Sequence, residues 1–184
     1  MKKLLRKKAV KLRKEMDHGD HVESSSKICD RLIALPEYKE SKTIMGYMAK
    51  GHEVDISAAL EHAIENKKKL VLPKVIGRTL VLHEVTDISR SLRKGSFDIL
   101  EPTKGSIVRK NEVGAFLVPG VLFDKSGNRL GHGHGFIDRL LKGANGTKIG
   151  ICHDWQLEEK IPAGKSDVPM DIIITESNIV RVTK

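Results

Sequence analysis

The stretch GAFLVPGVLFDKSGNRLGHGHGFIDRLL, residues 114–141, predicts a strand, a loop, an anion site and a helix in that order. An apolar run ends in Pro119-Gly120, and three glycines follow at alternate positions from Gly131 to Gly135. Glycine lacks Cβ, so its backbone can adopt positive φ and approach a ligand closely, and consecutive N–H groups of such a loop can point at one phosphate. We therefore expect a triphosphate site in this stretch.

Charged side chains stand at both ends of this segment, residues 129–138, which we call the glycine loop. Arg129 offers a planar charged fork to phosphate oxygens, and Asp138 offers a hard oxygen ligand to a magnesium ion. A helix over residues 136–142 would turn its positive end toward the same space. Arg129 and Asp138 are the candidate catalytic residues.

Neither of the two familiar nucleotide motifs accounts for the glycine loop. The Gly-Lys-Ser at residues 164–166 has Glu159 where a Walker loop has its leading glycine, and neither Gly131 nor Gly133 begins a G-x-G-x-x-G fingerprint. A plain tight connection with no ligand is the alternative interpretation of this segment.

His132 and His134 precede Asp138 at a spacing that loosely resembles a metallo-hydrolase ligand set. Imidazole is a good ligand for zinc or iron, but such a site usually takes three or four protein ligands. The remaining histidines form no second cluster at ligand spacing, so the sequence disfavours zinc.

The composition predicts one soluble domain over residues 1–184. Cys29 and Cys152 are far apart and favour neither a disulfide framework nor a zinc knuckle, which is typical of a cytoplasmic protein. No apolar run is long enough to span a bilayer. We expect a cytoplasmic monomer that does not bind a membrane.

The formal net charge of +9 favours an anionic partner. Aromatic residues make up only 4% of the chain, which is few for the stacking platforms that single-stranded nucleic acid requires. A small anionic molecule is therefore the better prediction, with an RNA-associated protein as an alternative that rests on charge alone.

Two helices are predicted near the beginning of the chain. Leu5, Ala9, Leu12 and Met16 recur at helical spacing among lysines and arginines, which predicts a basic amphipathic helix. Serines 24–26 are candidate caps for a second helix that ends before Pro36.

Beyond residue 42, apolar runs alternate with a helical pattern over residues 56–66. This order predicts a three-layer α/β/α fold with a central mixed, largely parallel sheet, whose ligands bind beyond the carboxyl ends of the strands. The strands are expected at residues 43–48, 69–73, 80–85, 115–119, 147–153, 171–175 and 179–182.

Three further loops carry charged residues beside these strands. Glu53 and Asp55 follow the first strand, Lys74 follows the second, and Asp167 stands between two prolines ahead of an apolar strand. Charged loop residues are commonly just solvated, but these side chains are expected to converge at one edge of the sheet.

The pattern V-P-G-x-x-F-D-x-x-G-x-R-L-G-x-G-x-G-x-x-D, residues 118–138, closely resembles the signature of the 5-formyltetrahydrofolate cyclo-ligase family. Further stretches similar to the family occur in the same order at residues 2–6, 53–55, 72–74, 101–102, 167–171 and 174–176. The resemblance implies an ATP- and Mg²⁺-dependent conversion of 5-formyltetrahydrofolate to 5,10-methenyltetrahydrofolate, with ATP as co-substrate.

The resemblance also implies roles for particular residues. Magnesium would be held by Asp138 and Asp167. The residues expected to contact ATP are Lys2, Lys3, Leu4, Leu5, Arg6, Arg129, Leu130, Gly131, His132, Gly133, His134, Gly135, Phe136 and Ile137. The residues expected to contact the folate are Met48, Glu53, His132, Gly133, His134, Gly135 and Phe136.

The sequence departs from the family pattern within the glycine loop. Phe136-Ile137 stands where the family commonly has Tyr-Tyr, and His132 and His134 replace more usual Arg, Lys, Tyr or Gly residues. Phe136 can stack on a pterin but has no hydroxyl group to donate. A noncatalytic or altered-substrate folate- or nucleotide-binding member of the family is therefore the alternative function.

Overall fold

The apolar runs pair into one eight-stranded sheet in the order β13-β12-β10-β7-β1-β2-β3-β6, in a computed structural model that describes residues 1–183. The five central strands pair in parallel, and each of the three outer strands pairs antiparallel with its inner neighbour. The parallel strands are β1 (Thr43–Met45), β2 (Lys69–Ile76), β7 (Ala115–Pro119), β10 (Thr147–Ile151) and β12 (Ile172–Ile174), and the antiparallel ones are β3 (Thr79–Glu84), β6 (Ile107–Val108) and β13 (Ile179–Arg181).

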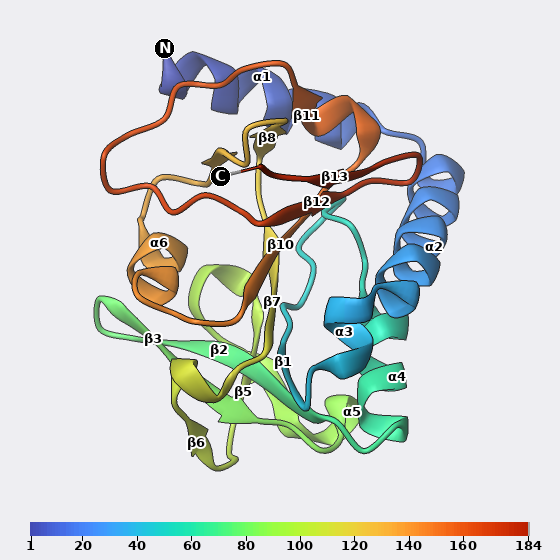
Figure 1. The fold of residues 1–184 in the computed structure, drawn as a ribbon, viewed down its shortest axis with the longest axis vertical. Coiled ribbons are helices and arrows are strands. Elements are labelled where there is room, and N and C mark those ends of the chain that lie inside the picture. Colours follow the sequence, from blue (N-terminus) through green and yellow to red (C-terminus); the bar gives the residue numbers. More distant parts are fainter. Residues whose placement is uncertain (184) are drawn as a thin grey trace.

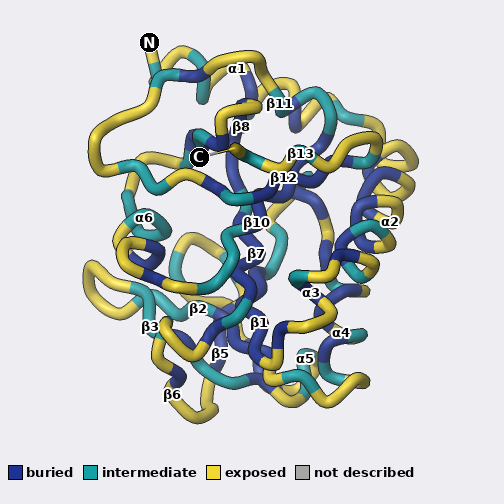
Figure 2. The backbone as a smooth tube through the Cα atoms, viewed as in Figure 1, coloured by how far each residue is buried: buried dark blue, intermediate teal, exposed yellow. Residues whose placement is uncertain are grey.

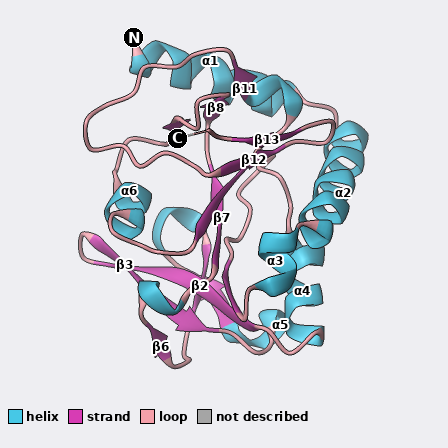
Figure 3. Ribbon diagram, in the orientation of Figure 1, coloured by secondary structure: helices cyan, strands magenta, loops and turns pink. Residues whose placement is uncertain are grey.

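Helices cover both faces of this sheet, which confirms the predicted three-layer architecture (Figures 1 and 3). One face carries α2 (His18–Ala34), α3 (Pro36–Glu40), α4 (Ser57–Glu65) and the short α5 (Ile88–Ser91), and the other carries α6 (Phe136–Leu141). The helix predicted at residues 56–66 is α4, and it connects β1 to β2, which pair in parallel with Thr43 opposite Lys69.

Strand β7 divides the core into two clusters, because its side chains alternate between the two faces of the sheet. Ala115 and Leu117 belong to the cluster with α2 and α4, whereas Phe116 and Val118 belong to the cluster with Leu141 of α6. All four β7 residues are fully buried, as a strand covered on both faces requires (Figure 2).

Helix α1 (Lys2–Glu15) lies over a small separate sheet of β8 (Leu122–Asp124), β9 (Arg129–Leu130) and β11 (Leu157–Glu158). Ala9 packs there against Leu122 and Leu130, and Trp155 packs against the same cluster. The predicted apolar stripe of α1 is wrong at one position: Leu12 is 44% exposed, whereas Arg13 is buried at 7%.

The second helix begins earlier than the serines predict. Asp17 caps α2 by accepting hydrogen bonds from the N–H groups of Gly19 and Asp20, so serines 24–26 lie inside the helix. Tertiary contacts stabilise serine there: Ser24 Oγ lies 2.7 Å from His153 Nδ1. The predicted end before Pro36 is confirmed.

Other boundaries agree with the prediction to within a few residues, and β1 is shorter than expected. The sequence did not predict the hairpin of β4 (Leu92–Lys94) and β5 (Leu100–Pro102), nor the 3₁₀ turns Ser96–Asp98, Lys110–Glu112 and Asp154–Gln156. Among residues 1–183, no helix combines the length and the apolar character that crossing a bilayer requires.

Candidate active site

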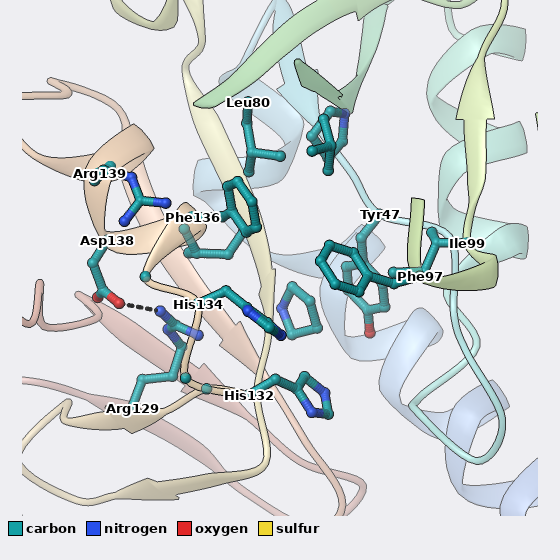
Figure 4. A pocket seen from close by; sticks show the side chains of 18 of the residues that line it. Tyr47, Leu80, Phe97, Ile99, Arg129, His132, His134, Phe136, Asp138 and Arg139 are labelled. Atoms are coloured by element: carbon teal, nitrogen blue, oxygen red, sulfur yellow. Dashed lines mark hydrogen bonds and ion pairs between the residues drawn. The ribbon is translucent and has the colours of Figure 1, made fainter. Parts of the chain in front are cut away.

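A cavity of about 690 Å³ opens beyond the carboxyl ends of β1 and β7, where the parallel sheet was expected to bind its ligand (Figure 4). Its cationic end is lined by Lys2, Arg6 and Arg129 together with the glycine loop and Asp167. Its aromatic end is lined by Tyr47, Met48, Leu72, Pro73, Phe97, Ile99 and Phe136. The cavity thus offers charge at one end and flat apolar surfaces at the other.

Glycine is required at two positions of the loop by the backbone conformation and at a third by the close approach of the Arg129 side chain. Gly133 has φ +107° and Gly135, which caps α6, has φ +69°, so both occupy a region that disfavours other residues. A Cβ on Gly131 would lie 2.7 Å from Arg129 Nη1. Arg6 Nε also donates to the Gly131 carbonyl oxygen at 2.7 Å, which ties α1 to the loop.

Arg129 and Asp138 form an ion pair across the glycine loop, with 3.0 Å between Nη2 and Oδ2 (Figure 4). The second oxygen of Asp138 accepts the N–H of Val168 at 3.1 Å. Burial lowers the pKa of Arg129, and the neighbouring carboxylates of Asp138 and Asp167 oppose this shift. The guanidinium keeps its charge, because an arginine titrates far above neutral pH.

Lys2 and Asp167 form a second ion pair at the cationic end, with 2.7 Å between Nζ and Oδ2. The Gly164 N–H donates to the same oxygen at 2.7 Å. Burial acts to raise the pKa of Asp167, but the hydrogen bonds from Lys2 and Gly164 outweigh it, and the net pKa is lowered. Asp167 is therefore a carboxylate at neutral pH.

Two carboxylates, Asp138 and Asp167, line the cationic end of the cavity, and their oxygens are of the kind that magnesium prefers as ligands. Mg²⁺ is usually held by one or two carboxylates plus substrate phosphates and water rather than by a full protein cage. Within residues 1–183 there is no group of three or more His, Cys, Asp or Glu residues that could hold a metal ion. Asp138 and Asp167 fit a magnesium ion that arrives with a phosphate, and the residues do not fit a protein-caged zinc ion.

The aromatic end is built by the β4-β5 hairpin facing the glycine loop. The ring of Phe97 lies 4.8 Å from that of His134 and 6.1 Å from that of Phe136, measured between centroids (Figure 4). Phe97 adopts φ +58°, an uncommon backbone conformation for a bulky residue, and Lys50 Nζ donates to its carbonyl oxygen. Such strain concentrates at functional sites.

Phe97 was not predicted from the sequence. A half-exposed phenylalanine in a loop carries no periodic signal, and a positive φ is not expected at a non-glycine position. The neighbouring similarity to the family at residues 101–102 was the one signal that could have drawn attention to this hairpin.

Glu53 adds a carboxylate to the lining of the cavity. Glu53 is 9% exposed, and its Oε1 lies 3.4 Å from His132 Nε2 of the glycine loop. The Lys50 N–H donates to Oε2 at 3.1 Å, and Arg13 contacts Oε1 at 3.2 Å. A carboxylate in this position can accept hydrogen bonds from N–H groups of a bound ligand.

Most of the predicted site residues meet in this cavity. The residues that line it are Lys2, Arg6, Met48, Glu53, Asp167 and all ten residues of the glycine loop, 129–138. Lys3, Leu4 and Leu5 are not among the lining residues: Leu4 is 73% exposed, and Leu5 packs against the cluster beneath α1. Lys74 and Asp55 are also outside the lining, and Asp55 accepts hydrogen bonds from Ser57 at the start of α4.

The fold and the cavity define a class of protein: α/β proteins that bind small molecules beyond the strand ends of a parallel sheet. The model of the 5-formyltetrahydrofolate cyclo-ligase family matches residues 1–176. The 5,10-methenyltetrahydrofolate synthetase of Aquifex aeolicus, solved by NMR, superposes with a TM-score of 0.91 at 37% identity, covering 100% of this chain and 93% of that one.

Two further relatives agree. The 5,10-methenyltetrahydrofolate synthetase of Mycoplasma pneumoniae has a TM-score of 0.78 at 27% identity, with 95% of this chain and 98% of that chain covered. A protein of Schizosaccharomyces pombe named as a probable 5-formyltetrahydrofolate cyclo-ligase is 29% identical over 183 residues, covering 89% of this chain and 90% of the relative. The chain is therefore an enzyme of the 5-formyltetrahydrofolate cyclo-ligase family.

Proposed function

We propose that this enzyme converts 5-formyltetrahydrofolate and ATP to 5,10-methenyltetrahydrofolate, ADP and phosphate, with Mg²⁺ as cofactor. The observation that supports it best is the two-ended cavity, in which the cations and glycine loop adjoin a carboxylate and an aromatic surface. A triphosphate suits the cationic end, and a pterin ring suits Phe97, Phe136 and Glu53. Its partners are then two small molecules, with no part for a nucleic acid or a membrane.

The reaction needs an activated oxygen, because the formyl group on N5 resembles an amide and its oxygen leaves poorly. The γ-phosphoryl group moves from ATP to the formyl oxygen, and ADP is released. N10 then attacks the formyl carbon and loses its proton, and the C–O bond breaks with its electron pair going to phosphate. The ring closes, and one ATP is consumed per methenyl product.

The residues of the cavity suit both parts of this sequence. Phosphoryl transfer is catalysed chiefly by positioning and by neutralising charge. Lys2, Arg6 and Arg129 would contact phosphate oxygens, and the N–H groups of the glycine loop would hold the terminal phosphate. Mg²⁺, bound by Asp138 and Asp167, would supply further positive charge to these oxygens.

The aromatic end would hold the folate with its N5 side toward the phosphates. Phe97 and Phe136 offer ring faces to the pterin, and Met48 fills the adjoining apolar surface. Glu53 would accept hydrogen bonds from pterin N–H groups. Because charge and aromatic surface are adjacent in one cavity, both substrates can meet without a further domain.

The direct test is to mix the purified protein with 5-formyltetrahydrofolate, ATP and Mg²⁺ and to follow the near-ultraviolet absorbance of the methenyl product together with ADP. We expect both products in equal amounts and neither when ATP is omitted. If calorimetry shows binding of both ligands but no ADP is produced, the protein is instead a noncatalytic member of the family. The missing Tyr-Tyr pair is the reason to consider this alternative. Absence of binding by the folded protein would overturn both.

A further inference from the structure

Helix α1 carries one buried cation among exposed lysines. Arg13, in the last turn of the helix, is 7% exposed, whereas its neighbours Lys11 and Lys14 are exposed. Removing a guanidinium from water is unfavourable unless charged or polar partners replace the solvent. The partners of Arg13 therefore indicate why it is buried.

Its two terminal nitrogens bind two different segments behind the cavity. Nη1 donates to Glu53 Oε1 at 3.2 Å, in the loop that follows β1, and Nη2 donates to the Gly120 carbonyl oxygen at 2.5 Å, just beyond β7. Glu53 and Gly120 both line the cavity, and Arg13 does not. Arg13 thus links two neighbouring strand ends from outside the ligand space.

These contacts fix the carboxylate of Glu53 at both oxygens. Oε1 accepts from Arg13, and Oε2 accepts from the Lys50 N–H at 3.1 Å. The Glu53 backbone is held as well, because its carbonyl oxygen lies 2.8 Å from His21 Nε2. The Glu53 side chain, 11% exposed, has little room to choose another orientation.

A packed layer supports Arg13 in turn. Gln156 donates to the same Gly120 carbonyl oxygen at 3.1 Å, and its own oxygen accepts the His153 N–H at 3.0 Å. The carbonyl oxygen of Arg13 lies 2.7 Å from His52 Nδ1. Lysine could replace only one of these two contacts, because a single ammonium group lacks the planar fork that reaches two separated acceptors.

We propose that Arg13 is a positioning residue that holds the Glu53 carboxylate in the orientation in which it accepts N–H groups of the folate. The role in folate recognition rests on the function proposed above. A purely structural ion pair would stabilise the fold without favouring one substrate over the other. Arg13 contacts Glu53, Gly120 and His52 but no residue of the glycine loop, so a positioning role predicts that its loss weakens folate binding and leaves nucleotide binding unchanged.

The test compares Arg13→Met and Arg13→Lys with Lys14→Met, which removes an exposed cation one residue further along the same helix. Affinities for 5-formyltetrahydrofolate and for a nonhydrolysable ATP analogue are measured separately by calorimetry, alongside KM and kcat. We expect the folate Kd and KM to rise about 10-fold or more in Arg13→Met, as for loss of a charged hydrogen-bond partner. Arg13→Lys should recover part of this loss. The nucleotide Kd of both Arg13 variants should match that of the wild type, and Lys14→Met should match the wild type in every measurement.

A double-mutant cycle with Glu53→Gln separates positioning from general destabilisation. If Arg13 acts through Glu53, adding Arg13→Met to Glu53→Gln should weaken folate binding little further. Equal losses of folate and nucleotide affinity, or additive losses in the double variant, would overturn the proposal. Melting temperatures identify a variant that fails to fold, in which case Arg13→Lys carries the comparison.

A crystal structure of the variant keeps this test independent of the proposed function. We expect the Glu53 carboxylate to turn away from the Lys50 N–H once Arg13 is removed. A carboxylate that stays in place would overturn the positioning role even if the enzyme is active. A wild-type protein with no folate affinity would overturn the proposed function, and the displacement of Glu53 would still be measured.

Discussion

Arg129 Nη2 and Asp138 Oδ2 lie 3.0 Å apart, so the cation proposed to contact phosphate and the carboxylate proposed to hold magnesium form an ion pair with each other. Lys2 and Asp167 are paired in the same way at 2.7 Å. Removing either partner of such a pair leaves a partly buried charge uncompensated. In the proposed function, Mg²⁺ and a phosphate that arrive together would supply each side chain with a new partner of opposite charge, so we expect the site to bind them jointly.

Asp138→Asn should lower turnover about 100-fold or more, because it removes an electrostatic contact at the phosphates. It also leaves Arg129 without its charged partner, so we expect a lower melting temperature. Steady-state rates over a range of Mg²⁺ concentrations measure the effect. Asp30→Asn, which removes an exposed carboxylate from α2, is the control. Wild-type turnover in Asp138→Asn would contradict the magnesium role.

Gly133→Ala should weaken nucleotide binding about 10-fold or more, because alanine disfavours φ +107° and the loop must change its shape. Gly143→Ala is a matched control: it also has a positive φ, +72°, with open space at its Cβ, but it lies outside the cavity. Both variants should lose about 1 kcal/mol of stability or more. Equal nucleotide affinities, measured by calorimetry, would show that the loop does not hold the phosphates.

Phe97→Ala should raise the KM for the folate about 10-fold and leave the KM for ATP unchanged, because it removes one ring face at the aromatic end. The melting temperature should change little, since the side chain is half-exposed. Ile107→Ala is the control, because it removes a more exposed apolar side chain from β6, outside the cavity. A shift in the KM for ATP alone would place the nucleotide, and not the pterin, against Phe97.

His153 should make the protein less stable in acid. Burial, with the charge of nearby His21 acting in the same direction, lowers the pKa of His153 to about 4. In the unfolded chain the pKa of this histidine is about 6.5. As pH falls from about 6.5 to about 4, the unfolded state therefore binds a proton at this residue and the folded state does not. Stability is complete above this window and falls through it by up to about 3 kcal/mol.

Urea unfolding at a series of pH values measures this contribution. In His153→Gln the free energy of unfolding should depend less steeply on pH between about 6.5 and about 4. His18→Gln, which removes an exposed histidine, should keep the wild-type slope. An unchanged slope in His153→Gln would contradict the assignment to this residue.

The fold was largely predictable from the sequence because its central strands are buried on both faces. The run at residues 115–119 is apolar throughout, which is typical of a parallel strand covered by helices. The start of α2 was missed because the serines at 24–26 resemble caps, whereas Asp17 has the capping contacts and Ser24 is stabilised by His153 far along the chain. A local sequence pattern does not indicate which distant residues will become hydrogen-bond partners.

The candidate site was predictable where it is continuous in sequence and not where it is assembled by folding. The glycine loop could be identified from its glycines, Arg129 and Asp138 alone. Arg13 looked like one more basic residue on a solvated helix, because nothing near it in sequence indicates Glu53 as a partner 40 residues away. Phe97 was missed because no pattern in the neighbouring sequence indicates its exposure or its positive φ.

The origin of the oxygen in the released phosphate tests the proposed reaction most directly. 5-Formyltetrahydrofolate labelled with ¹⁸O in the formyl group is incubated with the enzyme, unlabelled ATP and Mg²⁺ in ordinary water, and the inorganic phosphate is analysed by mass spectrometry. Phosphorylation of the formyl oxygen predicts one ¹⁸O atom in each phosphate formed. Unlabelled phosphate accompanying the methenyl product would show that water attacks ATP and would contradict the mechanism proposed for this cavity.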